Sequence, residues 1–214
     1  GRLVHENLIA TDVKSTVAIA NEAIELNPLQ FSLYGGQYNG RMRLAMGGGT
    51  PAVALEGRFN DIDVNQFLSA SSSVKETIYG RASGTLDLRS RGQQFDDIIR
   101  AVNGQGTLAV REGKITSFDL ERQVALIGNL TGLPTGGAGT IFRDLQMAVR
   151  FVDGQMLTEG LRLELGDFEV GGSGGLRLGD PVVADYDLLA RLSKELAQRV
   201  VPQGKISQVA GNFF

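Results

Sequence analysis

QFDDIIRAVNGQGTLAVREGKITSFDL, residues Gln94 to Leu120, is the stretch that decides the fold. Apolar residues recur in its first part at the three-and-four spacing of a helix face, from Phe95 to Val102. Asp96 and Asp97 would lie in the first turn, where carboxylates favour the free N–H groups. Asn103-Gly104 is typical of a C-terminal left-handed break. The spacing therefore predicts a short helix that ends before Asn103.

The second part of the stretch has the two-residue period of β-structure. Leu108 and Val110 alternate with polar residues, and Glu112-Gly113 has the composition of a turn. An apolar series then resumes at Ile115, Phe118 and Leu120. We expect a helix that feeds a hairpin with its turn at Glu112-Gly113.

Length and composition predict one large β-rich domain over residues 1–214. Hydrophobic residues make up 42% of the chain and charged residues 21%, which is typical of a folded protein. The 29 glycines against 5 prolines have no collagen-like period and lie between alternating segments. We interpret them as turn and bulge residues of many short strands. The composition favours an all-β, turn-rich architecture.

Charge and cysteine usage exclude several classes of partner. The formal net charge of −3, with no clustered basic face, argues against nucleic acid. The absence of cysteine excludes disulfides and thiolate metal sites. No apolar run approaches the roughly 20 residues that a membrane-spanning helix needs. Because the chain also lacks an initiator Met, we expect a soluble piece of a longer protein whose anchor lies elsewhere.

The rest of the chain is predicted to be a meander of strands with a few short helices. Further helices are expected after Asp61 or Asp63, around 124–130 and around 193–200, giving two to four in total. Residues 145–178 repeat the order strand, turn, strand, double glycine, strand of residues 17–44, which indicates a weak internal repeat.

The sequence offers little for catalysis. His5 is the only histidine and stands near a terminus without a fixed partner. The aspartate pairs precede helical patterns, so helix capping explains them. The loop Gly136–Thr140 lacks the Gly-Lys-Ser/Thr ending of a phosphate cradle. We expect a protein that is not an enzyme and that needs no cofactor and no metal.

The alternating apolar residues allow two interpretations. They can form the closed core of a sandwich or of a helix-covered sheet, which the spacing alone favours. Alternatively, a long curved sheet has more apolar face than a few short helices can cover, and an open face would be a trough for acyl chains. The candidate lipid-binding residues are Phe31, Leu33, Leu44, Leu55, Leu86, Leu88, Leu163 and Leu165.

Several phrases, taken in order, resemble the C-terminal region of AsmA-like proteins. They are the short helix, Asn-Gly-Gln-Gly, a strand, Glu-Gly-Lys-Ile and Phe-Asp-Leu of the opening stretch. Flanking phrases that fit the same region are Leu33-Tyr34-Gly35-Gly36 with Gly40, Asp63-Val64 before Phe67-Leu68, and Gly80 and Gly84 before Leu86-Asp87-Leu88. Gly204-Lys205-Ile206 also fits, but the proline that usually follows in the family is missing.

The resemblance implies a periplasmic module of a protein anchored in the inner membrane, similar to bridge-type lipid-transfer proteins. The implied function is phospholipid transport between the inner and outer membranes, with phospholipid acyl chains and envelope proteins as partners. The expected fold is mainly β, a curved, groove- or taco-like antiparallel sheet with capping helices. A structural or protein-interaction module that assists outer-membrane protein assembly, through an open strand edge, is the alternative. A carbohydrate-binding sandwich is disfavoured because tryptophan is absent and aromatic residues make up only 7%.

Overall fold

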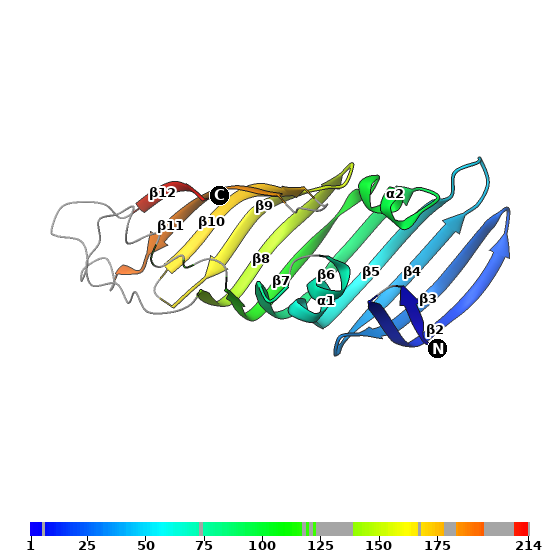
Figure 1. Ribbon diagram of the computed structural model, residues 1–214, viewed down its shortest axis with the longest axis horizontal. Helices are drawn as coiled ribbons and strands as arrows, with labels where there is room; N and C mark the ends of the chain where they lie inside the picture. Colours follow the sequence, from blue (N-terminus) through cyan, green and yellow to red (C-terminus); the bar gives the residue numbers. More distant parts are fainter. Residues whose placement is uncertain are drawn as a thin grey trace.

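The computed structural model describes residues 1–5, 7–72, 75–116, 119, 122, 139–166, 168–177, 183–194 and 208–213. Its strands form one open sheet in sequence order, and each strand is antiparallel to its neighbours (Figure 1). The strands are β1 (Leu3–His5), β2 (Leu8–Ala20), β3 (Ala23–Leu33), β4 (Gly36–Ala45), β5 (Ala52–Asp63), β6 (Ile78–Arg91), β7 (Asn103–Ile115), β8 (Thr140–Val152), β9 (Gln155–Glu164), β10 (Phe168–Arg177), β11 (Val183–Leu192) and β12 (Gln208–Phe213). The expected meander of antiparallel strands is confirmed.

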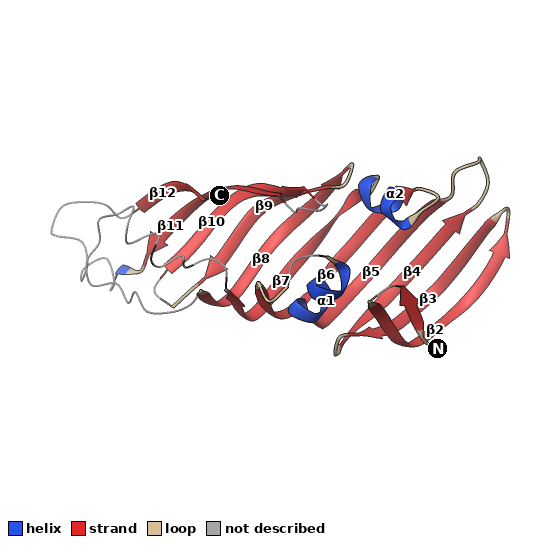
Figure 2. Cartoon of the chain, viewed as in Figure 1, coloured by secondary structure: helices blue, strands red, loops and turns tan. Residues whose placement is uncertain are grey.

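Two short helices lie at opposite ends of the strands (Figure 2). Helix α1 (Val64–Ser71) connects β5 to β6, and the backbone N–H of Gln66 donates to the Asp63 carboxylate at 2.9 Å. Helix α2 (Phe95–Arg100) connects β6 to β7, and the Asp97 carboxylate accepts from the Gln94 N–H at 3.2 Å. The interpretation of these aspartates as capping residues is confirmed. The helices expected around 124–130 and 193–200 fall almost entirely outside the described residues.

The sheet has one apolar and one polar face, because residues paired across antiparallel strands point to the same side. On one side, pairing connects Leu26, Met42, Leu55 and Leu88 across β3 to β6. On the other side, it connects Glu25, Arg43, Ala54 and Arg89 across the same four strands. We call the first side the apolar face and the second the polar face.

Bulges keep the apolar residues on one face along strands of ten or more residues. In β3, Leu26 pairs with Met42 and Leu29 with Gly40, so Asn27-Pro28 forms a bulge between them. Both leucines remain on the apolar face, although simple alternation would separate them. Pro28 was expected at a strand start or edge, but it lies within this bulge of a strand that is paired on both sides.

The prediction of a hairpin turn at Glu112-Gly113 is wrong. β7 runs through both residues and pairs with β6 on one side and β8 on the other. Glu112 has a φ of 50°, and it forms a bulge with Gly113 instead of reversing the chain. Turns and bulges both use a residue with positive φ, so local sequence does not separate them.

The predicted break at Asn103-Gly104 is also displaced. α2 ends at Arg100, and both residues already belong to β7, with Gly104 paired to Leu88. In the same way, β1 and the first half of β2 occupy residues 1–15, which carry no clear apolar pattern. The first half of β2 is a strand because it pairs with β3, although its own sequence does not predict one.

The interpretation of the glycines as turn and bulge residues holds for some of them, such as Gly35 and Gly48 in turns, but many others lie inside strands. Gly84 in β6 pairs with Phe59, and a Cβ atom added there would meet the Phe59 ring and the Thr107 carbonyl. Gly113 pairs with Phe142, whose ring occupies the place of the missing side chain. An aromatic ring on one strand thus lies against a glycine on the next, which fills the gap that the glycine leaves.

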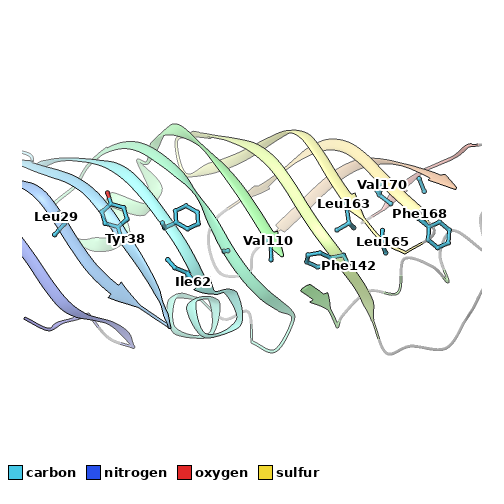
Figure 3. Packing of buried hydrophobic residues seen from close by; sticks show 12 residues of the cluster. Leu29, Tyr38, Ile62, Val110, Phe142, Leu163, Leu165, Phe168 and Val170 are labelled. Carbon is cyan, nitrogen blue, oxygen red and sulfur yellow. The ribbon is translucent and has the colours of Figure 1, made fainter. Parts of the chain in front are cut away.

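The buried cluster runs along the apolar face from β3 to β11. Figure 3 shows its side chains on one side of the sheet. Its members are Leu29, Tyr38, Phe59, Ile62, Ala82, Val110, Phe142, Leu163, Leu165, Phe168, Val170 and Ala190. The two segments of the predicted repeat, 17–44 and 145–178, each cover strands of three-stranded meanders, β2 to β4 and β8 to β10. The repeat itself stays a prediction.

Candidate functional site

The sheet is concave on its apolar face. Val64 of α1 packs against the buried cluster, so α1 lies on the apolar side. The same helix lies near β5, β6 and β2, although β3 and β4 separate β2 from β5 in the sheet. A flat sheet could not bring β2 to that helix, so the first strands curve toward it (Figure 1). Bulges such as the one at Asn27-Pro28 favour this curvature.

The apolar face is incompletely covered. Val17 and Ile19 of β2 pair with Leu26 and Ile24, which places all four on this face. Val17 is 58% exposed and Ile19 is 77% exposed. In the described part of the chain no second sheet lies against this face, and α1 and α2 reach only the ends of the strands. The end of the face that Ile19 marks is therefore open to solvent.

The residues proposed for lipid contact lie together. Seven belong to strands and point to the apolar face; Leu165 follows β9 and is buried in the same cluster. Leu163 and Leu165 are 7% and 6% exposed, which makes them structural members of the core. The half-buried residues, which a ligand can reach, are Phe31, Leu33, Leu44, Leu55, Leu86 and Leu88. Their contact with lipid stays a prediction.

Sequence reasoning missed part of the face. Val17, Ile19, Ile24 and Val53 are exposed or half-buried apolar residues of strands β2 to β5. Their two-residue spacing was visible, but only the strand register shows that they share a side with Leu44, which pairs with both Ile24 and Val53. They extend the candidate face to β2.

Two tyrosines place polar groups on the apolar face. The Tyr38 ring stacks on Phe31 with ring centroids 4.8 Å apart, and its buried hydroxyl has no hydrogen-bond partner among the described residues. Burial, together with the nearby Glu56 carboxylate, raises the pKa of Tyr38 to about 12. The Tyr186 hydroxyl instead lies 2.9 Å from that of the buried Thr158, and burial raises the pKa of Tyr186.

The polar face carries a network of ion pairs. Arg162 contacts Glu164 at 3.1 Å and Glu169 at 3.2 Å, and Arg41 pairs with Glu56. All these side chains are at least 37% exposed, so each pair contributes little to stability. Their main effect is to make this face of the sheet polar, so that it favours contact with solvent.

The candidates for catalysis do not form a site. Asp63 caps α1, and Asp97, in the first turn of α2, accepts from the Gln94 N–H. The side chain of His5 lies outside the described residues, as does most of the loop Gly136–Thr140. Where side chains are described, no three His, Cys, Asp or Glu residues gather in a way that could hold a metal ion. The chemistry that this arrangement can provide is apolar contact on one side and charge on the other.

The fold and the apolar face together define a class of protein: those built on an open antiparallel sheet with a concave apolar groove. The model of the AsmA family matches residues 1–161, and the chain belongs to this family. The family is associated with the bacterial envelope. No curated protein and no solved structure matches the chain. Within the described residues, no helix has the length and hydropathy needed to cross a membrane.

Proposed function

We propose that the apolar face binds phospholipid acyl chains and that the chain contributes to phospholipid transport between the inner and outer membranes. The observation that carries this proposal is the open end of the apolar face, where Val17 and Ile19 are 58% and 77% exposed on the concave side. In this role the protein is not an enzyme, and it acts in the periplasm as part of an inner-membrane-anchored protein. Family membership supports an envelope role.

The face suits acyl chains because they need no directional partner. Each CH₂ group removed from water contributes about 0.8 kcal/mol, so a row of Leu, Ile, Val and Met side chains lowers the cost of exposing a lipid tail. The side chains that could provide such a row are Ile24, Leu26, Met42, Leu44, Val53, Leu55 and Leu88.

The dimensions of the sheet also fit lipid. A ten-residue strand is roughly 33 Å long, about twice the 15 Å half-thickness of a bilayer core. Twelve strands, separated by eleven spacings of about 4.8 Å, extend over at most about 53 Å. Acyl chains could therefore occupy successive positions along the face, and movement along it would be passive.

An alternative function is a structural module that pairs with another envelope protein during outer-membrane protein assembly. The observation that favours it is the edge of β2. β1 pairs only with Leu8 to Ala10, so the outer edge of residues 14–20 has no partner strand in the described structure. Such an edge can accept an extended segment. This alternative does not require an open apolar face.

Native mass spectrometry with lipid extraction tests the proposal. The parent chain is compared with an Ile19→Asp/Leu44→Asp variant, whose substitutions lie on one pairing row of the apolar face. Ile141→Asp is the matched control, because Ile141 is 71% exposed but neighbours the inward-pointing Phe142 and so faces the polar side. We expect the parent and the control to retain phospholipid and the double variant to lose it. A lipid-free parent, folded by circular dichroism, would instead favour the interaction module.

A further inference from the structure

Two hollows on the polar face differ in charge. The larger, about 570 Å³, is lined by both signs, including Glu56, Asp87 and Glu159 beside Arg58 and Arg150. The smaller, about 370 Å³, is lined by three arginines, Arg43, Arg89 and Arg91, and by no carboxylate; Ala52, Ala54 and Asn103 also line it. The lining of the first hollow carries charges of both signs, whereas the lining of the second carries only positive charges, which favour an anion.

The register explains how the smaller hollow forms. Ala54 of β5 stands between Arg43 and Arg89 in one row of the polar face, and Ala52 stands beside Arg91 in the next row. Because alanine is short, the arginines of β4 and β6 extend on either side of a space that no side chain fills. Guanidinium groups on two sides of a small space are suited to a phosphate, since each can donate parallel N–H bonds.

The three arginines are not fully neutralised. Arg43 donates to Glu25 at 3.0 Å, and Arg89 lies 4.0 Å from Asp87 with its side chain 78% exposed. Arg91 has no ion pair or side-chain hydrogen bond within the described ranges. Two of the three guanidinium groups therefore have a carboxylate partner and that of Arg91 has none. A third carboxylate nearby, Asp153, accepts from Asn103, and no carboxylate lines the hollow itself.

The hollow lies at the rim of the sheet. Arg91 is the last residue of β6 and Ala52 the first of β5, at the strand ends next to α2. Val53 and Ser90, which point to the apolar face, also line it. The apolar face begins on the other side of this rim, at the same strand ends.

We infer that the hollow binds a phosphate group, which is supplied by the headgroup of a lipid whose acyl chains lie on the apolar face. The assignment to a lipid rests on the proposed function, but the phosphate site does not. A net positive site favours a lipid with net negative charge, such as phosphatidylglycerol, over zwitterionic phosphatidylethanolamine, in which an ammonium group offsets the phosphate.

The test compares the parent chain with Arg89→Gln/Arg91→Gln. Arg150→Gln/Arg162→Gln is the matched control, which removes the same charge from paired arginines of the same face. Inorganic phosphate is titrated by NMR at low salt, and lipid retained from equimolar phosphatidylglycerol and phosphatidylethanolamine vesicles is extracted. We expect the Arg89/Arg91 variant to lose at least about tenfold in phosphate affinity and its excess of phosphatidylglycerol, while the control keeps both.

The other outcomes distinguish a failure of the phosphate site from a failure of the proposed function. Equal phosphate binding by all three proteins, or none by the parent, would overturn the site. Phosphate binding that depends on Arg89 and Arg91, with no effect on the retained lipid, would support the site and assign it to a soluble phosphate compound. A parent that binds phosphate but retains no lipid would contradict the proposed function and leave the phosphate site standing.

Discussion

Phe142 of β8 lies with its ring against Gly113 of β7, its direct partner in the sheet. Both are buried, Phe142 with only 2% of its surface exposed. The ring fills the space where Gly113 has no side chain, so the pair keeps a large aromatic residue close to the plane of the sheet. Phe59 and Gly84 repeat this arrangement on β5 and β6.

Gly113→Ala is expected to destabilise the protein by about 1–3 kcal/mol, because the added methyl group would collide with the Phe142 ring. Urea unfolding followed by circular dichroism measures the loss. Gly171→Ala is the control, since its Cβ would meet only the Leu161 carbonyl at 3.5 Å, and we expect a change within about 0.5 kcal/mol. Equal effects at both sites would show that ring packing is not the cause.

Tyr38→Phe removes a buried hydroxyl that has no partner among the described residues. Near neutral pH we expect the free energy of unfolding to stay the same or rise by up to about 1 kcal/mol, because no hydrogen bond is lost. Tyr79→Phe, at a 38% exposed position, is the control and should change nothing. A large loss of stability in Tyr38→Phe would reveal an essential partner of the hydroxyl.

The same residue predicts a pH dependence. The pKa of Tyr38 is raised from 10.0 to about 12 in the folded state, so the neutral phenol is favoured there. Its contribution to stability is fully present below pH 10 and is lost as the pH rises through the folded pKa. Between pH 10 and 12, the parent should therefore lose more stability than Tyr38→Phe. Parallel stability curves for the two proteins would contradict this.

Glu112 tests the bulge in β7. Its φ of 50° disfavours a β-branched side chain, so Glu112→Val is expected to cost about 1–2 kcal/mol. Glu112→Gly should be neutral or stabilise by up to about 1 kcal/mol, because glycine adopts positive φ without strain. Thermal unfolding of both variants measures the difference. A Val variant as stable as the Gly variant would mean that the bulge does not form.

Asp63 tests the start of α1. Asp63→Ala removes the carboxylate that accepts from the Gln66 N–H, and we expect a loss of about 1 kcal/mol. Asp63→Asn keeps an acceptor at the same position and should lose only a few tenths of a kcal/mol. Denaturant unfolding distinguishes the two. If both variants lose the same amount, the charge of Asp63 matters more than its capping bond.

The fold could be predicted from residue patterns where each strand alternates regularly, as in residues 42–46 and 186–192. Prediction failed where pairing with neighbouring strands decides whether a segment becomes a strand or a turn. Glu112-Gly113 has the local sequence of a turn, yet β6 and β8 hold it inside a strand. Lys14, Ser15 and Thr16 show no apolar pattern but belong to β2 because β3 pairs with that strand. Strand register depends on residues far apart in the chain, which local spacing does not contain.

Prediction of the candidate lipid-binding residues was limited in the same way. Alternation was enough to select Leu44, Leu55 and Leu88, which lie on one side of the sheet. It could not separate them from Leu163, which is buried, because exposure depends on how the sheet curves and on what covers it. It also gave no sign of the arginine hollow, since Arg43 and Arg91 line the same hollow only because β5 pairs with both of their strands.

Site-specific photo-crosslinking to a phospholipid with a photoreactive acyl chain tests the central claim most directly. A crosslinking amino acid is placed in turn at Leu44, Val53 and Leu88 on the apolar face, and at Arg43, Ala54 and Arg89, their sequence neighbours on the polar face. The account predicts lipid adducts at the first three positions and few at the second three. Adducts of equal yield on both faces, or none on the apolar face, would contradict it.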